Sequence, residues 1–164
     1  MNTAMNQIQI ATATFEDVEE ILTIQNTSPE SAQWSRSTYT DMLSACGGKE
    51  NSISRTVLCA RLHERIIGFA VVSSLRVSDG TKCELENLAV AADHRRSGVG
   101  TVLLKAVIEL CKQSGEACIN TEVRASNAAA LYLYKKNKFV PLAMRKAYYK
   151  HPEEDAIVLQ WTSD

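Results

Sequence analysis

The stretch His94-Arg95-Arg96-Ser97-Gly98-Val99-Gly100-Thr101 joins a strand-like run, Leu85 to Val90, to an amphipathic helix. Its two glycines allow the backbone to approach a ligand closely, and the start of a helix presents unpaired N–H groups and the positive end of the helix dipole. Its two arginines add charges that titration does not remove. We therefore predict that this stretch binds a pyrophosphate. A dinucleotide-binding fingerprint would require glycine at Leu103, and a Walker loop would require a following Gly-Lys-Ser/Thr, so neither motif applies.

The spacing Arg95-x-x-Gly98-x-Gly100 resembles the acetyl-CoA signature of the GCN5-related N-acetyltransferase (GNAT) family. For this motif alone, a glycine-rich turn that caps an ordinary helix is the alternative interpretation. A second segment, Thr121-Glu122-Val123-Arg124-Ala125-Ser126-Asn127-Ala128-Ala129-Ala130-Leu131-Tyr132-Leu133-Tyr134, resembles the ribosomal-protein-alanine N-acetyltransferase (RimI) branch of that family nearly residue for residue. Tyr148-Tyr149 and Glu154-Asp155-Ala156-Ile157 also resemble this branch, and the likeness extends over roughly residues 8–159.

The resemblance implies an α+β fold of the GNAT type. Such a fold has a mixed, mostly antiparallel sheet of about seven strands, flanked by about four helices and splayed at the acetyl-CoA site. The resemblance also implies acetyl-CoA as the co-substrate. The implied cofactor contacts are Leu88, Ala89, Val90, Arg95, Arg96, Ser97, Gly98, Val99, Gly100, Thr101 and Asn127. Of these, Leu88 to Val90 are expected to offer backbone groups to the pantetheine arm.

Acetyl transfer to an amine requires two proton movements, because the amine loses a proton and the departing thiolate gains one. A free α-amine has a pKa of about 7.7–8.0, so a carboxylate base such as Glu122 suffices, directly or through a water. Tyr134 is protonated at neutral pH and can donate to a thiolate. The resemblance assigns these two roles. From the residues alone, Glu122 can instead pair with Arg124 or Arg145, and Tyr134 can be an ordinary core tyrosine.

Other side chains near these segments have simpler interpretations beside the functional ones. Asn127 is a suitable N-cap for the helix that follows it, whether or not it also contacts a cofactor. Tyr148 and Tyr149 are expected to be one core and one exposed residue of a strand, and in N-terminal acetyltransferases tyrosines at this place line the peptide groove. Trp34 is expected to be a hydrophobic anchor. Cys118 is expected to be buried and inert, so direct transfer in a ternary complex is favoured over a covalent enzyme intermediate.

Length and composition fit one enzyme domain, residues 1–164, with a core of about 8–161. The net charge of −1 gives no global basic field for nucleic acid, and no apolar run is long enough for a membrane span. Residues 1–7 have neither the basic nor the apolar part of a signal peptide. The cysteines are odd in number and form no Cys-x-x-Cys pair, and the three histidines lack metal-ligand spacing. We expect a reduced, cytoplasmic protein without a metal site.

Hydrophobic periodicity predicts alternating strands and helices. Strands are expected at 8–13, 57–62, 66–74, 83–90 and 117–123, with two more from Phe139 onward around a loop at 150–154. Helices are expected after Thr14, after Ser35 or Ser37, from Val99 to an end at Gly115, and from Ala128, capped by Asn127, to about Asn137. Turns are expected at 47–51, 63–65 and 78–80. The helix after the glycines has an apolar stripe of Val99, Val102, Leu103, Ala106, Val107, Leu110 and Cys111.

Two local irregularities are visible in the sequence. Glu84 and Glu86 should share a strand face with Leu88 and Val90, and this change from charged to apolar fits a β-bulge or a splayed strand. The family carries Gly-Phe after the second helix, where this chain has Lys138-Phe139. Asn137 tolerates a left-handed conformation better than lysine does, so the helix cap is expected to shift to that residue.

These observations favour an acetyl-CoA-dependent N-α-acetyltransferase. By resemblance, the acceptor is a protein N-terminus, the N-terminal alanine of a small-subunit ribosomal protein. Acetylation of a lysine or small amine on the same scaffold is the enzymatic alternative, and a non-catalytic acetyl-CoA-binding module is the alternative of another class. The sequence does not indicate the oligomeric state.

Overall fold

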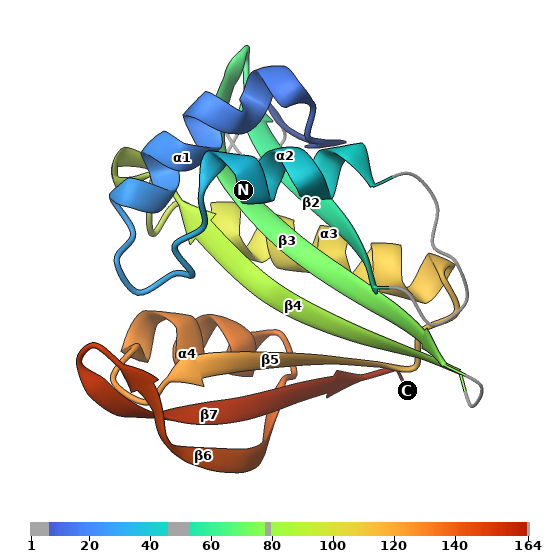
Figure 1. The fold of residues 1–164 in the computed structure, drawn as a ribbon, viewed down its shortest axis with the longest axis vertical. Coiled ribbons are helices and arrows are strands. Elements are labelled where there is room, and N and C mark those ends of the chain that lie inside the picture. The colour runs from blue at the N-terminus through green and yellow to red at the C-terminus, as the bar shows by residue number, and fades with distance from the viewer. Residues whose placement is uncertain (1–6, 46–52, 78–79, 164) are drawn as a thin grey trace.

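The computed structural model describes residues 7–45, 53–77 and 80–163, which form a seven-stranded sheet and four α-helices (Figure 1). The strands are β1 (Ile8–Thr12), β2 (Ile53–Leu62), β3 (Arg65–Val77), β4 (Gly80–Val90), β5 (Cys118–Arg124), β6 (Val140–Lys150) and β7 (Glu153–Thr162). The helices are α1 (Val18–Asn26), α2 (Arg36–Ser44), α3 (Val99–Gln113) and α4 (Ala128–Lys136), with single 3₁₀ turns η2 (Phe15–Asp17) and η3 (Ala92–His94). The predicted turn at 47–51, and residues 78–79 of the other predicted turn, lie outside the described residues.

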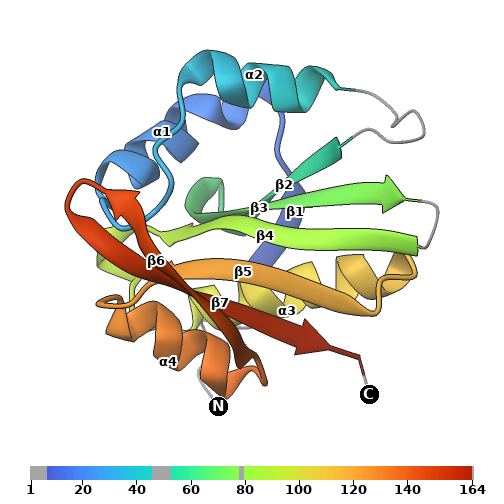
Figure 2. The same ribbon diagram turned by 60° about the horizontal axis from the view of Figure 1, so that its bottom comes forward.

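The strands have the order β1-β2-β3-β4-β5-β7-β6, and every neighbouring pair is antiparallel except β4 with β5. This confirms the mixed, mostly antiparallel α+β sheet that the family resemblance implies. Helices α1 and α2 cover one face, and α3 and α4 cover the other (Figure 2). A hydrophobic core therefore lies on each side of the sheet.

Helix α3 packs against the sheet through a narrower stripe than the periodicity predicts. Its buried side chains are Val99, Leu103, Leu104, Val107 and Cys111. Leu104, which the predicted stripe omits, is fully buried, whereas Val102, Ala106 and Leu110 are half-buried. Each buried leucine or valine contributes about 1.5–3 kcal/mol to stability. This packing fixes the direction of the helix and therefore the place of its N-terminus.

Strand β4 contains the predicted bulge, but the predicted faces are wrong. Val71 and Val72 of β3 pair with Asn87 and Leu85, so Glu86 is an extra residue in β4. An extra residue reverses the alternation of side chains. Leu88 therefore packs on the same side of the sheet as Leu85, against the core under α3, and does not continue the face of the preceding glutamates.

Strands β4 and β5 separate beyond a short paired region. Their register runs only from Cys83 opposite Ile119 to Leu85 opposite Thr121. After this point β4 continues to Val90 and β5 to Arg124 along diverging paths (Figure 1). The splayed sheet that the family resemblance implies is thus confirmed, and the separation begins beside Thr121.

Helix α4 ends in a way that corrects the prediction. Asn137 has φ −101°, whereas Lys138 itself has φ 68°. The Asn137 side chain donates to the Leu133 carbonyl at 2.8 Å, and the Phe139 N–H donates to the Tyr134 carbonyl at 3.0 Å. Burial of Phe139 requires the chain to turn at position 138, so the lysine adopts the left-handed conformation that glycine would adopt more readily.

Candidate active site

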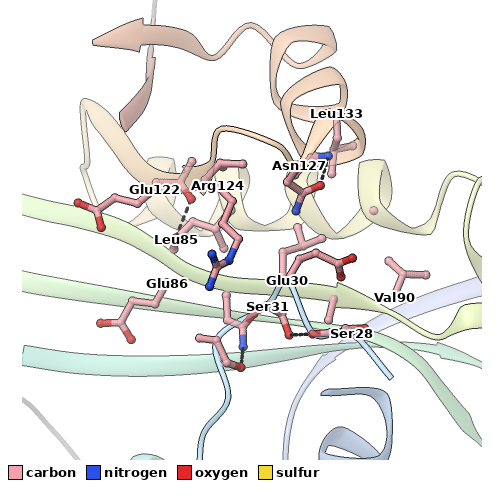
Figure 3. A pocket seen from close by; sticks show the side chains of 18 of the residues that line it. Ser28, Glu30, Ser31, Leu85, Glu86, Val90, Glu122, Arg124, Asn127 and Leu133 are labelled. Carbon is pink, nitrogen blue, oxygen red and sulfur yellow. Dashed lines mark hydrogen bonds between the residues drawn. The ribbon is translucent and has the colours of Figure 1, made fainter. Parts of the chain in front are cut away.

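A cleft of about 1300 Å³ opens where β4 and β5 separate. Its wall comprises the end of β4, the start of α3, strand β5 with helix α4, and the segment between α1 and α2. Figure 3 shows Glu122, Arg124 and Asn127 on one side of it and Ser28, Glu30 and Ser31 on the other. Most of the predicted cofactor contacts line the cleft: Leu88, Ala89, Val90, Arg95, Arg96, Gly98, Gly100, Thr101 and Asn127.

Two of the predicted cofactor contacts have side chains directed elsewhere. Val99 is 1 % exposed and belongs to the core under α3. The Ser97 hydroxyl donates to the His94 carbonyl at 2.5 Å, and this side chain closes the turn before α3. Any contact that these residues make with a cofactor must therefore come from the main chain.

The two glycines of the stretch serve different structural purposes. Gly98 is the N-cap residue of α3 and has φ 94°, a conformation that suits glycine. Gly100 lies within α3 and is not among the glycines with positive φ, so its backbone conformation does not require glycine. A Cβ at Gly100 would lie 3.2 Å from Leu133 Cδ2 and 3.9 Å from Leu88 Cδ2. Glycine at this position therefore permits close approach of α3 and α4 beside the cleft.

The start of α3 is suited to an anion. The first N–H groups of an α-helix have no carbonyl one turn before them, and the helix dipole favours negative charge at this end. Gly98, Gly100 and Thr101 all line the cleft. Arg96, also in the lining, has a left-handed backbone with φ 63° and an exposed side chain. These features fit a pyrophosphate group.

Arg95 has protein partners for its guanidinium group. Its Nε donates to the Val90 carbonyl at 3.1 Å, and its Nη2 donates to the Thr27 carbonyl at 2.7 Å and to Ser28 Oγ at 3.0 Å. These bonds direct the Arg95 side chain toward the segment between α1 and α2. The two neighbouring arginines therefore differ in the direction and the partners of their side chains.

Asn127 caps helix α4, as predicted. Its Oδ1 accepts from the Ala130 N–H at 3.1 Å, and the residue also lines the cleft (Figure 3). The cap and the predicted cofactor contact are therefore compatible, because capping occupies the amide oxygen and leaves the NH₂ group for another acceptor.

Glu122 lies on β5 and is held by residues of β6. Arg145 donates to Glu122 Oε1 at 2.5 Å, and the Arg145 guanidinium lies 4.0 Å from the centre of the Tyr148 ring. A hydrogen bond with Glu122 raises the pKa of Tyr148 above its ordinary value. One of the two ion pairs considered from sequence is thus present, with Arg145. Arg124 instead pairs with Glu154 at 3.4 Å.

Tyr134 of α4 is 5 % exposed and lines the cleft at the point where the strands separate. Burial raises its pKa to about 12. Its hydroxyl is hydrogen-bonded with Thr121, whose own hydroxyl donates to the Leu85 carbonyl at 2.9 Å. The ring contacts Phe139, with ring centres 5.2 Å apart. Tyr134 is therefore both a core tyrosine and a protonated group at the base of the cleft.

Tyr148 and Tyr149 both line the cleft, and their ring centres are 5.1 Å apart in an edge-to-face contact. Tyr148 is exposed and Tyr149 is half-buried, so neither is the core residue that the strand pattern predicts. Bulges in the pairing of β6 with β7 bring both side chains to the cleft. Arg124 lies 4.0 Å from the centre of the Tyr149 ring.

Sequence reasoning missed part of the site. The segment between α1 and α2 lines the cleft from Ser28 to Trp34, and β4 adds Glu84 and Glu86, which pairs with Arg55 at 2.8 Å. Burial raises the pKa of Glu84, and the nearby Glu122 and Glu86 add to this effect. Isolated glutamates and serines carry no motif, so no signal in the sequence marks them. This half of the cleft is rich in carboxylates.

Trp34 lies as the sequence predicts, whereas Cys118 is less buried than expected. Trp34 packs edge-on against Tyr39, with ring centres 5.8 Å apart, which confirms the hydrophobic anchor, and it also lines the cleft. Cys118, expected to be buried, is half-buried at the start of β5. No described cysteine lines the cleft. No helix within the described ranges is long and apolar enough to cross a membrane.

Comparison with known proteins gives three kinds of likeness. Residues 15–139 match the family profile described as "Acetyltransferase (GNAT) family". The [ribosomal protein bS18]-alanine N-acetyltransferase of Escherichia coli K12 is 42 % identical over 77 residues, which are 46 % of this chain and 52 % of that protein. The chain therefore spans about half the length of this curated relative.

Solved structures resemble the whole fold. The ribosomal-protein-S18-alanine N-acetyltransferase from Escherichia coli superposes with a TM-score of 0.74 at 27 % identity, over 94 % of this chain and 93 % of that one. A GNAT family acetyltransferase from Elizabethkingia anophelis, solved with acetyl-CoA bound, shares the fold with a TM-score of 0.71 at 23 % identity, over 96 % and 99 % of the two chains.

Proposed function

The chain belongs to the acetyltransferase (GNAT) family, and we propose that this acetyltransferase moves an acetyl group from acetyl-CoA to the α-amine of a protein N-terminus. We further propose that the acceptor is the N-terminal alanine of a small-subunit ribosomal protein, as the names of its E. coli relatives suggest. One observation carries this proposal. Glu122 of β5 and Tyr134 of α4 line the same cleft as the glycine-containing start of α3, at the point where β4 and β5 separate.

The residues at the start of α3 fit the pyrophosphate of acetyl-CoA. Main-chain N–H groups at Gly98, Gly100 and Thr101 would hold it, and Arg96 would add a positive charge. The end of β4 has no β5 partner after Leu85, so the main chain from Leu88 to Val90 can bond the pantetheine arm, and Asn127 faces the same path. When bound, acetyl-CoA supplies the acetyl group as a thioester.

Glu122 is proposed to accept the proton of the attacking amine, directly or through a water. The pKa of an α-amine, about 7.7–8.0, is close enough to neutral that modest assistance suffices. Arg145 and Tyr148 hold the carboxylate on the cleft side of the sheet. Glu122 therefore has a fixed orientation before an acceptor arrives.

Tyr134 is proposed to donate a proton to the departing thiolate. With a pKa of about 12, its hydroxyl is protonated throughout the physiological range. A thiol has a pKa of about 8.5, so proton transfer from Tyr134 to a free thiolate is unfavourable, and the proton is proposed to move to sulfur as the carbon–sulfur bond breaks. Tyr134 then regains a proton from solvent through the cleft that it lines. Thr121, whose hydroxyl donates to the Leu85 carbonyl at 2.9 Å, lies beside the Tyr134 hydroxyl at the base of the cleft.

We propose direct transfer between the two bound substrates. A covalent route requires a nucleophile in the cleft, and the described cysteines lie outside its lining. Burial also raises the pKa of the Cys59 thiol to about 12, which makes it a poor nucleophile.

The acceptor would lie between the tyrosines of β6 and the segment between α1 and α2. Tyr148 and Tyr149 offer ring faces and hydroxyl groups to a peptide backbone. The carboxylates Glu30, Glu84 and Glu86 in this half of the cleft favour a cationic amine.

A peptide assay tests the proposal. Purified protein is mixed with acetyl-CoA and either a peptide with a free N-terminal alanine or the same peptide blocked at its N-terminus and carrying an internal lysine. We expect mass spectrometry to place the acetyl group on the α-amine, with poor reaction of the blocked peptide. Faster transfer to lysine would replace the proposal with the lysine alternative. Binding of acetyl-CoA without thiol release across a mixed peptide library would indicate a non-catalytic module. Glu122→Gln is the matched inactive control.

A further inference from the structure

The Arg95 side chain connects three parts of the molecule. It belongs to the proposed pyrophosphate-binding stretch and bonds both to Val90 at the end of β4 and to Thr27 and Ser28 after α1. Thr27 and Ser28 are 67 or more positions away in sequence. A single guanidinium group thus links the proposed cofactor-binding stretch to the opposite wall of the cleft.

That wall, residues 27–35, is an ordered unit built on its own hydrogen bonds. The Ser28 carbonyl accepts from Ser31 Oγ at 2.7 Å and from Gln33 Nε2 at 3.0 Å. Gln25 Oε1 accepts from the Trp34 N–H at 3.0 Å and from the Tyr39 hydroxyl at 2.7 Å. Because these bonds connect the two ends of the segment, a restraint applied at Ser28 extends to Trp34.

A second link joins the middle of the same segment to β4. Asn87, which follows the bulge and is 5 % exposed, donates from Nδ2 to the Ala32 carbonyl at 3.0 Å. Asn87 lies within the sheet, whereas Arg95 lies in the stretch that would contact the cofactor. A ligand at the start of α3 would therefore act on the segment through Arg95.

We propose that Arg95 is a positioning residue, which holds the acceptor-facing segment 27–35 in place relative to the bound cofactor through its side chain. This inference rests on the proposed N-terminal acetyltransferase function. The planar guanidinium has five donors in a fixed arrangement, so it bonds Val90 through Nε and both Thr27 and Ser28 through Nη2. A lysine ammonium at this position has one nitrogen and cannot bridge the same acceptors. The Arg95 main chain remains part of the proposed pyrophosphate site.

Hydrogen exchange with acetyl-CoA as the only ligand tests the link without any acceptor. In the wild-type protein, acetyl-CoA should slow amide exchange both in residues 94–101 and in residues 27–35. In Arg95→Ala it should slow exchange in residues 94–101 only. Equal protection of residues 27–35 in the two proteins, or no protection of that segment in the wild type, would overturn the proposal.

Steady-state kinetics with an N-terminal alanine peptide separates Arg95 from its neighbour. Arg95→Ala should raise the peptide KM about tenfold at saturating acetyl-CoA, with kcat and acetyl-CoA affinity within about threefold of wild type. The matched variant Arg96→Ala should show the reverse, with weaker acetyl-CoA binding and a peptide KM that is unchanged at saturation. If Arg95→Ala instead behaves like Arg96→Ala, its guanidinium is a phosphate contact and the proposal is wrong.

Two further variants keep the test decisive if Arg95→Ala does not fold. Ser28→Ala removes one acceptor of the Arg95 side chain and should raise the peptide KM about threefold, whereas an unchanged KM would contradict the link. Arg95→Lys keeps the positive charge but cannot bond Val90, Thr27 and Ser28 together, so its peptide KM should rise as in Arg95→Ala. Full activity in Arg95→Lys would contradict the proposal. If the wild type acetylates no peptide, the proposed function fails, while the exchange experiment still decides the role of Arg95.

Discussion

Replacing Gly98 by alanine tests the proposed pyrophosphate site most directly. Gly98 has φ 94°, and a residue with a Cβ in a left-handed conformation is disfavoured by roughly 1–2 kcal/mol. The unfolded alanine variant has less conformational entropy than the unfolded wild type, and this difference offsets about 0.4–1 kcal/mol of the strain energy. The net destabilisation is therefore about 1 kcal/mol, which lowers the melting temperature by about 2–4 °C for a chain of this size.

The binding effect of Gly98→Ala should exceed its effect on stability. Relief of the strain rotates the peptide units on either side of Gly98, and the Gly98 N–H is one of the proposed phosphate donors at the start of α3. We expect acetyl-CoA affinity, measured by isothermal titration, to fall about tenfold or more, which corresponds to about 1.4 kcal/mol. Gly98→Asn should lose less, because asparagine tolerates the left-handed region.

Gly100→Ala is the matched control. Its backbone is helical, and alanine is favoured over glycine in a helix by about 0.5–1 kcal/mol. Its Cβ would approach Leu133 Cδ2 at 3.2 Å, and this methyl group ends a half-buried side chain that can shift by a few tenths of an ångström. We expect an unchanged or higher melting temperature and an acetyl-CoA affinity within about threefold of wild type. If Gly98→Ala folds and binds acetyl-CoA as the wild type does, the proposed donors at the start of α3 are wrong.

Three other outcomes follow from the geometry. Glu122→Gln and Tyr134→Phe should each lower the pre-steady-state transfer rate by roughly 10²–10⁴-fold, with little change in acetyl-CoA affinity. Only the Glu122→Gln defect should shrink at high pH, where more of the amine is already neutral. If both variants keep the full chemical rate, Glu122 is only a structural ion-pair partner of Arg145. Glu122→Gln should also lower the pKa of Tyr148 in an ultraviolet pH titration, because the hydrogen bond that raises it involves the carboxylate, and an unchanged Tyr148 titration would argue against that bond. Lys138→Gly should raise the melting temperature by about 2–4 °C, because glycine adopts the left-handed backbone conformation without strain. Lys138→Ala keeps that strain and should not raise the melting temperature. Equal melting temperatures of the two variants would show that loss of the lysine side chain, and not relief of backbone strain, changes the stability.

The proposed catalytic half of the cleft is the part that the sequence predicts well. Glu122, Asn127 and Tyr134 lie within one strand–helix unit, so their mutual positions follow from local geometry and short spacing. The same holds for the stretch before α3, where glycine spacing and an apolar stripe specify both the turn and the direction of the helix. Local patterns are informative when the interacting groups lie close together in the chain.

Bulges limit what the pattern of a strand can predict. A strand pattern assigns side chains to faces by counting residues, and one extra residue reverses the count. The bulge at Glu86 moves Leu88 to the core side of β4, and the irregular pairing of β6 brings Tyr148 and Tyr149 together on the cleft. The sequence indicates the first bulge by the change from charged to apolar residues on one predicted strand face. The resulting register, however, depends on pairing with β3.

Contacts between distant segments account for the remaining part of the site. The partner of Glu122 is Arg145, 23 positions away, and the choice between Arg145 and Arg124 is decided by the order β5-β7-β6. Arg124 has Glu154 of β7 beside it and takes that partner instead. In the same way, Arg95 has the spacing of a cofactor residue, yet its side-chain partners, Thr27 and Ser28, come from the other wall of the cleft. A motif therefore predicts where a main chain contacts its ligand more reliably than it predicts what each side chain within the motif does, because the long side chains of a binding loop bond to whatever the fold brings beside them.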